Sequence, residues 1–244
     1  MRRVLALLVV ALVCGLVVQA KADYVALSTP DLVGNQTWTG NLGLDFNVAS
    51  PIWVTALGAY DSSGNGFSST ITVGLYQRST TAPPPLTAGN PSTEHYGSLL
   101  ASKSLLGTPA DWEGDYRYVP LSSAIQLQPG DYSIVAVGFG SGNPNGNENI
   151  SPPSFIVNAY SGSQLSFVGT GRYDSKTTLD YPYYTTAQNG YPNVTPEVFA
   201  AGSFEFSLAN PAVIGVPEPT GIVALLGLAG MGLIGLVWRR RAAA

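Results

Sequence analysis

The C-terminal end of the sequence places the strongest constraint on what this chain can fold into. Residues 221–238 form a run of eighteen residues without a charge, and Arg239, Arg240 and Arg241 follow directly. As an α-helix with a rise of 1.5 Å per residue, the run would be about 27 Å long. The hydrocarbon core of a bilayer is about 30 Å thick, so residues 221–244 are predicted to form a transmembrane helix with an arginine-rich tail. The arginines are expected on the cytoplasmic side, which places the rest of the chain on the outer side.

The N-terminal end has the three parts of a secretory signal peptide. Arg2 and Arg3 give a basic start, residues 4–18 are uncharged and mostly apolar, and Ala20 and Ala22 are the small residues of a cleavage site. Fifteen residues are fewer than the roughly 20 that span a bilayer core, so a cleaved signal helix over 1–22 is favoured over an uncleaved anchor.

A short motif precedes the C-terminal run. Val216, Pro217, Glu218 and Pro219 end a proline-rich linker, residues 209–220. Together with the uncharged run and the arginines, residues 216–244 resemble the PEP-CTERM sorting signal of Gram-negative bacteria. This resemblance implies an exported protein whose partners are the secretion machinery, the inner membrane and an exosortase-type sorting enzyme that cuts near the motif. The precursor would be anchored in the inner membrane and the product would lie at the cell surface or outside the cell. The alternative is a plain single-span anchor after a proline-rich linker.

The segment between the two ends is acidic and lacks cysteine. Residues 23–215 hold fourteen acidic and five basic residues, a balance of −9. Nucleic acid needs a basic footprint, so no nucleic-acid partner is expected. Cys14 is the only cysteine and lies in the predicted signal peptide, which excludes a disulfide or a cysteine metal site from the mature protein.

Residues 23–208 are predicted to form one all-β ectodomain, a β-sandwich or jelly roll. Short runs rich in β-branched and aromatic residues alternate with clusters of Gly, Pro, Ser, Thr and Asn, which is typical of short strands joined by turns. The predicted strands are 43–48, 52–60, 70–77, 98–106, 116–121, 132–138, 154–158, 165–169 and 202–208. Residues 132–137 are nearly all apolar and are expected at the centre of a sheet.

A second resemblance covers roughly residues 44–138. An ordered set of motifs, among them Val54–Asp61, Gly64–Phe67 and Leu127–Tyr132, is similar to an uncharacterised β-sandwich module of many bacterial secreted proteins. This resemblance implies the fold and little about function, because one fold hosts many functions.

One turn resembles the start of a calcium-binding loop. Asp61, Ser63 and Asn65 offer oxygen ligands at alternate positions and a glycine follows. The twelfth position holds Thr72 where an EF-hand has glutamate, and the flanking segments are predicted strands. A hairpin turn in which glycine and asparagine adopt positive φ is the favoured interpretation, and Ca²⁺ is the alternative.

The sequence shows no catalytic constellation, so no enzymatic activity and no cofactor are expected. His95 is the only histidine, and the G-x-S-x-G motif of serine hydrolases is absent. The expected role is structural or interactive, at the cell surface or in an extracellular matrix. The alternative is a carbohydrate-binding module for exopolysaccharide, since the ectodomain holds all thirteen tyrosines, including those at 181, 183, 184 and 191.

Overall fold

The structure, a computed structural model, describes residues 24–29, 33–78, 97–108, 111–147, 157–158, 160, 162–182, 184–185 and 199–211. The strands belong to one compact unit, Ala22–Ala209. The predicted signal peptide, residues 1–22, and the predicted membrane helix, residues 221–238, lie outside the described residues. Among the residues that are described, no helix has the length and apolarity needed to cross a membrane.

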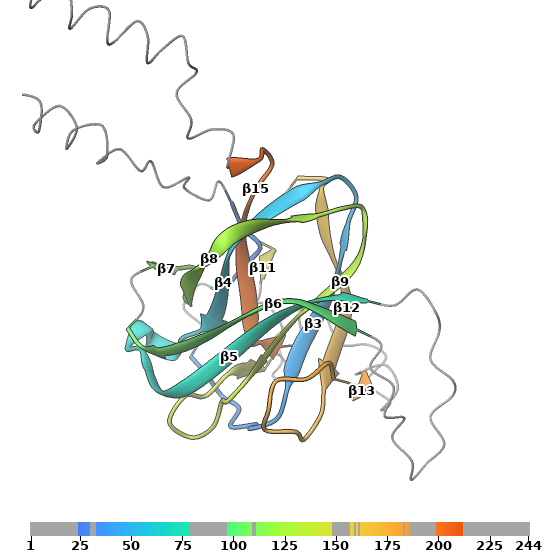
Figure 1. Cartoon of the computed structure of the whole chain (residues 1–244). Helices are drawn as coiled ribbons and strands as arrows, with labels where there is room; N and C mark the ends of the chain where they lie inside the picture. Colours follow the sequence, from blue (N-terminus) through green and yellow to red (C-terminus); the bar gives the residue numbers. More distant parts are fainter. Residues whose placement is uncertain are drawn as a thin grey trace, which may run out of the picture. The chain divides into compact units, whose positions relative to one another are not determined.

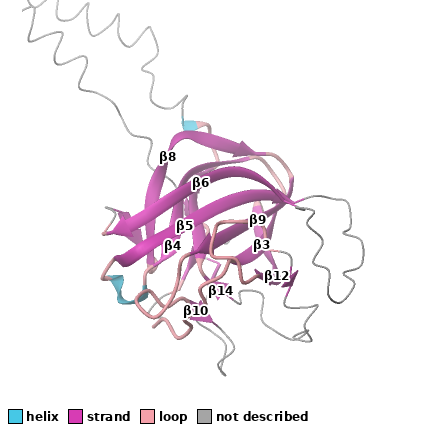
Figure 2. Cartoon of the chain, turned by 60° about the horizontal axis from the view of Figure 1, so that its bottom comes forward, coloured by secondary structure: helices cyan, strands magenta, loops and turns pink. Residues whose placement is uncertain are grey.

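Two antiparallel sheets account for most of the described residues (Figures 1 and 2). The five-stranded sheet runs in the order β1 (Tyr24–Val25), β15 (Gly202–Ser207), β4 (Ile52–Tyr60), β8 (Tyr116–Leu127) and β7 (Asp111–Glu113). The six-stranded sheet runs in the order β13 (Tyr184–Thr185), β12 (Leu165–Tyr173), β3 (Leu42–Val48), β9 (Gly130–Val137), β5 (Phe67–Arg78) and β6 (Gly97–Gly107). Two short pairs join β10 (Gly146–Asn147) to β14 (Phe199–Ala200) and β11 (Val157–Asn158) to β2 (Leu27–Ser28). A 3₁₀ turn, η1 (Ser62–Gly64), lies between β4 and β5.

Six of the strands form three nested antiparallel pairs, as in one long hairpin that is folded over on itself. The innermost pair is β5 with β6, the next is β4 with β8, and the outermost is β3 with β9. Because successive pairs fall in alternate sheets, the chain crosses repeatedly between the two layers. This nested pairing is similar to that of a jelly roll. β12 extends the six-stranded sheet and β15 extends the five-stranded sheet.

The two sheets share one hydrophobic core. Inward-facing residues alternate with outward-facing ones along β3, so that Leu42, Leu44 and Phe46 are buried against the other layer. The Phe46 ring of the six-stranded sheet lies 5.0 Å from the Phe204 ring of the five-stranded sheet. Such aromatic pairs contribute about 0.5–1.5 kcal/mol beyond the burial of their area, so they help to fix the two sheets against each other.

The all-β prediction is confirmed for the described residues. The strand predicted at 52–60 has these bounds, and the apolar segment 132–137 lies in β9, between β3 and β5. The predicted strand bounds differ by a few residues elsewhere, and the short strands β1, β2, β7, β10, β13 and β14 were not predicted. The division of the chain into four segments stays a prediction.

Candidate functional site

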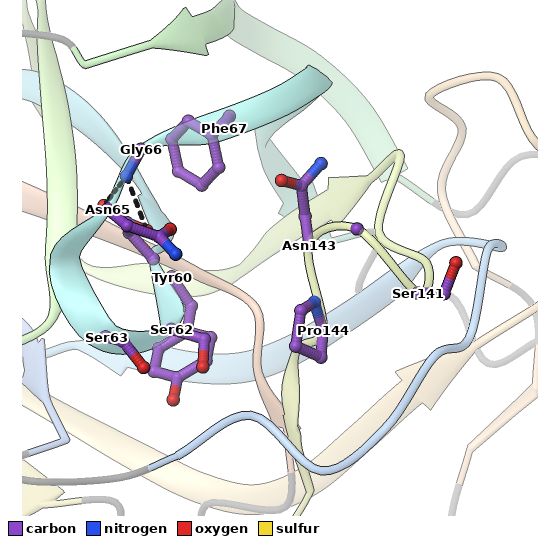
Figure 3. Close-up of a pocket in the computed structure, with 11 residues that line it drawn as sticks. Tyr60, Ser62, Ser63, Asn65, Gly66, Phe67, Ser141, Asn143 and Pro144 are labelled. Atoms are coloured by element: carbon purple, nitrogen blue, oxygen red, sulfur yellow. Dashed lines mark hydrogen bonds between the residues drawn. The ribbon is translucent and has the colours of Figure 1, made fainter.

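A polar pocket of about 280 Å³ opens between two loops of the β domain. One wall is the turn between β4 and β5, residues 60–67, and the other is the hairpin that follows β9, residues 141–144. Figure 3 shows the two walls, with Asn65 on the turn and Ser141 on the hairpin. Because β4 and β9 belong to different sheets, the pocket lies where loops of both layers meet.

Asp61 fixes the first wall. Its carboxylate accepts hydrogen bonds from the Gly66 backbone N–H at 2.9 and 3.1 Å and from the Arg117 Nε at 2.5 Å. The Arg117 Nη2 donates to the Gly64 carbonyl at 2.6 Å, which ties the guanidinium to the same turn. Asp61 is 2% exposed and Arg117 is 8% exposed, so this is a buried ion pair whose partners also satisfy the backbone.

Backbone strain accompanies this turn. Ser63 has φ of 69°, a left-handed conformation that is uncommon for a residue other than glycine. Gly66 has φ of 87°, and a Cβ there would lie 2.6 Å from the Gly107 carbonyl oxygen, so both conformation and space require glycine. Strained residues of this kind cost about 1–3 kcal/mol and occur often at functional sites.

Asn143 anchors the second wall. Its side-chain Oδ1 accepts from the Ser68 backbone N–H at 2.9 Å, and its Nδ2 donates to the Ser69 Oγ at 2.6 Å. Its backbone exchanges two hydrogen bonds of 3.1 Å with Gly140, which closes the hairpin. These contacts hold the hairpin against the start of β5.

A third segment connects the two walls. The Gly34 N–H donates to the Ser62 Oγ at 2.8 Å, and the Asn145 Nδ2 donates to the Gln36 Oε1 at 2.9 Å. The backbone of Gln36 also pairs with Asn145. Hydrogen bonds therefore link both walls to residues 34–36, so the pocket is pre-formed by its own scaffold.

The pocket offers hydrogen-bonding groups and little net charge. The side chains of Ser63, Asn65 and Ser141 are exposed and make no hydrogen bond within the described part of the chain. Burial raises the pKa of Tyr60 to about 12, so its hydroxyl is neutral at physiological pH. Asp61 is already paired with Arg117. The site therefore suits a neutral ligand that carries hydroxyl or amide groups, and it lacks a poised acid, base or nucleophile among these side chains.

The structure brings the predicted calcium ligands to this wall. Asp61, Ser63 and Asn65 all line the pocket, and the favoured interpretation as a turn agrees with η1. The turn is not a hairpin, because β4 and β5 lie in different sheets. Asn65 has φ of −93°, and positive φ is found at Ser63, Gly64 and Gly66 instead. The carboxylate of Asp61 contacts a guanidinium, so a cation at this carboxylate would have to compete with Arg117. In the described ranges, no three His, Cys, Asp or Glu side chains gather in a way that suits a metal ion. Calcium binding at this turn stays a prediction.

The other residues singled out from the sequence have different places. Tyr181 is 4% exposed and packs against Tyr76, so its ring is not available for stacking on a sugar. Tyr184 contacts Tyr173 on the neighbouring strand. The remaining candidates lie outside the described residues: Tyr183, Tyr191, His95, Val216, Pro217, Glu218, Pro219, Arg239, Arg240 and Arg241.

Sequence reasoning missed the second wall of the pocket. Residues 138–153 are rich in Gly, Asn and Pro, a composition that predicts turns. Composition does not indicate which other residues such turns contact. The available signal was the recurrence of Asn at 143, 145 and 147, since asparagine side chains often bond to nearby backbone.

The comparisons with known proteins identify the C-terminal tail. Residues 215–241 match the family model of the PEP-CTERM protein-sorting motif. No curated protein and no solved structure matches the chain. The resemblance of the tail to a PEP-CTERM signal is thus confirmed. The motif marks an exported, sorted protein whose precursor passes a membrane, and it implies processing by an exosortase-type enzyme.

Proposed function

We propose that this chain is a surface protein that is exported, cut near its sorting motif, and retained at the cell surface or in an extracellular matrix. Its β domain then has a structural or interaction role. The observation that carries this proposal is the sorting motif at residues 215–241. The composition of residues 23–215 is consistent with it, because fourteen acidic against five basic residues give a net negative charge that favours solubility.

Fractionation of the native host with intact-mass measurement tests the proposal. We expect a product that begins near Asp23 and ends near Pro217, found outside the inner membrane. Deletion of the sorting enzyme, or Glu218→Ala in the motif, should leave a longer species that keeps residues 221–244. Glu197→Ala, a matched change outside the motif, is the control. A full-length inner-membrane protein in the unmodified host would refute the proposal.

A second candidate function is binding of a neutral carbohydrate in the pocket. Ser63, Asn65 and Ser141 line the pocket with polar side chains that make no hydrogen bond to any other described residue, and they match the hydroxyl groups of a sugar ring. The volume of about 280 Å³ is at the small end for ligand sites, which suits one sugar unit better than a long segment.

Glycan-array binding of the full chain in detergent tests this second candidate. The double variant Asn65→Ala with Ser141→Ala removes two exposed side chains that support no described contact, so the fold should persist. We expect loss of binding to neutral glycans in this variant and unchanged binding in Ser98→Ala, which alters an exposed serine of β6. Equal binding by all three proteins would exclude the pocket as the sugar site.

A further inference from the structure

The outer face of the six-stranded sheet carries a charged cluster that is separate from the pocket. Cross-strand partners Asp45, Ser133 and Tyr76 lie in one row over β3, β9 and β5, with their side chains directed away from the shared core. Arg78 at the end of β5 and Arg172 on β12 reach the same row. A carboxylate in the middle of a sheet face is therefore flanked by two guanidinium groups.

Asp45 is fully buried at the centre of this cluster. Its Oδ1 accepts a hydrogen bond of 2.5 Å from the Ser133 Oγ and one of 2.6 Å from the Arg172 Nε. The Arg78 Nε lies 3.5 Å from its Oδ2. Both arginines thus approach Asp45 through Nε. Their terminal Nη groups make no hydrogen bond among the described residues, although a guanidinium offers five N–H donors in a planar fork.

Two arginines share the Asp45 carboxylate, while burial and the nearby carboxylates of Asp180 and Asp174 raise the pKa of Tyr76 in the same row. Two guanidinium groups face one carboxylate, in an ectodomain that has only five basic residues against fourteen acidic ones. The side chains of Arg172 and Arg78 are 13% and 25% exposed, so they are partly removed from water. Partly buried Nη donors without a hydrogen bond cost free energy, which an anion bound at the Nη groups would offset.

Tyr181 covers one side of the cluster. The Arg172 guanidinium carbon lies 4.9 Å from the centre of the Tyr181 ring, and the Tyr76 ring lies 5.5 Å from that centre. A Cβ at Gly97 would lie 2.3 Å from the same ring, so the tyrosine packs directly on β6. Burial raises the pKa of the Tyr181 hydroxyl, which keeps it neutral beside the two arginines. The ring therefore orients Arg172 without neutralising it.

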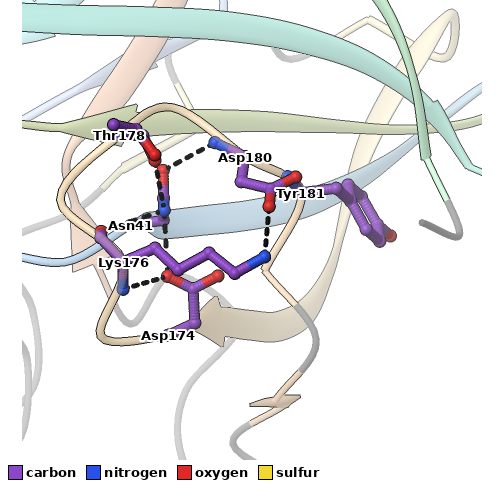
Figure 4. Close-up of polar contacts among 6 residues, drawn as sticks. All are labelled: Asn41, Asp174, Lys176, Thr178, Asp180 and Tyr181. Carbon is purple, nitrogen blue, oxygen red and sulfur yellow. Dashed lines mark hydrogen bonds and ion pairs between the residues drawn. The ribbon is translucent and has the colours of Figure 1, made fainter. Parts of the chain in front are cut away.

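A hydrogen-bonded loop holds Tyr181 in place (Figure 4). The Asn41 Nδ2 donates to the Asp174 Oδ1 at 2.9 Å and to the Lys176 and Thr178 carbonyls at 3.2 and 3.0 Å. The Asp180 N–H donates back to the Asn41 Oδ1 at 3.1 Å. Asn41 is fully buried, so one side chain fixes the loop that leads into Tyr181. The geometry around Arg172 is thus pre-organised, which lowers the entropy cost of binding.

We propose that Arg78 and Arg172 bind a carboxylate carried by an acidic polysaccharide, with one uronate group seated on the two Nη ends. A planar guanidinium fork matches a planar carboxylate. The sorting motif marks an exported protein, and under the proposed surface role this face would meet extracellular polysaccharide. The rest of the domain is acidic, so a dense polyanion is repelled while a polymer with widely spaced uronates is tolerated. The inference rests on the proposed surface role and is independent of the pocket.

Binding of the full chain in detergent to immobilised hyaluronan, which carries a uronate on every second sugar, tests the proposal. Carboxyl-reduced hyaluronan is the neutral counterpart. We expect binding to hyaluronan alone, and a loss of about tenfold or more in Arg78→Gln, since a charge-assisted hydrogen bond contributes about 1.5–3 kcal/mol. Lys103→Gln is the control, because it also removes one positive charge. Lys103 is paired with Val73, which faces the core, so it lies on the opposite face of the sheet from the arginines. This variant should bind like the unmodified chain.

Each alternative outcome overturns a distinct part of the proposal. Equal affinity of Arg78→Gln and Lys103→Gln would exclude the arginine site. Equal binding of carboxyl-reduced hyaluronan would show recognition of neutral sugar, and the pocket variants would then locate it. Free glucuronate that binds as tightly as the polymer would exclude a polysaccharide as the specific occupant. If Arg172→Lys fails to fold because Asp45 loses its closest charged partner, Arg78→Gln still decides, since the 3.5 Å contact of Arg78 contributes less to the fold.

Discussion

Replacing Asp61 with asparagine is expected to lower the free energy of unfolding of the β domain by about 3 kcal/mol. The carboxylate pairs with the Arg117 Nε at 2.5 Å, and both residues are almost fully buried. Removing one partner of a buried ion pair costs about 3–5 kcal/mol, because the other charge is left without compensation. An asparagine oxygen still accepts the Gly66 N–H, which places the expected loss at the lower end.

The loss can be measured by chemical denaturation and by thermal unfolding of the purified chain. For a domain of this size, 1 kcal/mol corresponds to about 2–4 °C, so a decrease of about 6–12 °C is expected. The Trp112 indole lies against Gly64 of the same turn, so its fluorescence should report the local change. Asp111→Asn is the matched control, because Asp111 is exposed on the edge strand β7 and should change stability by less than about 0.5 kcal/mol.

Two results would refute this reasoning. If Asp61→Asn and Asp111→Asn unfold at the same denaturant concentration, the ion pair does not stabilise the turn. If Asp61→Asn is destabilised only when calcium is present, the carboxylate acts as a metal ligand and Arg117 is not its principal partner.

Three further predictions follow from the same structure. Calcium should not raise the melting temperature relative to a chelator, because Arg117 occupies the Asp61 carboxylate; a rise of several degrees at millimolar calcium would favour the cation instead. Burial raises the pKa of Tyr60 to about 12 from an ordinary value near 10, so the stability that its neutral form contributes is complete below about pH 10 and is lost as the pH rises through 12. Denaturation midpoints and tyrosinate absorbance at alkaline pH check this, and full ionisation before unfolding would contradict it. Gly97→Ala should cost about 1–3 kcal/mol, because its Cβ would lie 2.3 Å from the Tyr181 ring, whereas Gly130→Ala, whose nearest neighbour is at 3.7 Å, should cost less.

Strand positions were predictable where burial alternates along the chain. The segment 52–60 was predicted correctly because apolar residues mark the face that packs on the core. The strand beginning at Tyr116 was predicted to end at residue 121 but continues to Leu127. Pro120 and two serines obscure the pattern there, and a register shift opposite residues 54–56 accommodates the proline within the pairing. β7 was missed because Asp111 and Glu113 are charged, which an exposed edge strand tolerates.

The sites were much harder to predict than the strands. The turn at residues 61–66 is visible in the sequence, but its partner Arg117 lies 56 residues away and is positioned by the pairing of β4 with β8. The two walls of the pocket are likewise separated by about 75 residues, as in the contact of Ser68 with Asn143. Asp45 gave no signal in the sequence, because a single acidic residue within a predicted strand reads as an outward-facing polar position. Only the tail, whose function is carried by contiguous residues, could be read directly.

The buried carboxylates of Asp61 and Asp45 differ in the number of arginines that they contact, and we infer different roles for them. Asp61 faces one arginine, and that arginine also bonds to the Gly64 carbonyl, so the pair is neutral and closes its own turn. Asp45 faces two arginines whose Nη groups make no hydrogen bond among the described residues, so this cluster keeps donors that the fold does not use. The Asp61–Arg117 pair stabilises the fold, because removing either residue leaves the other charge buried without a partner. The Asp45 cluster favours binding of a further anion, because that anion would accept hydrogen bonds from the Nη donors of Arg78 and Arg172. Loss of Asp61 should therefore weaken the domain itself, whereas loss of Arg78 should leave the domain folded and change what it binds.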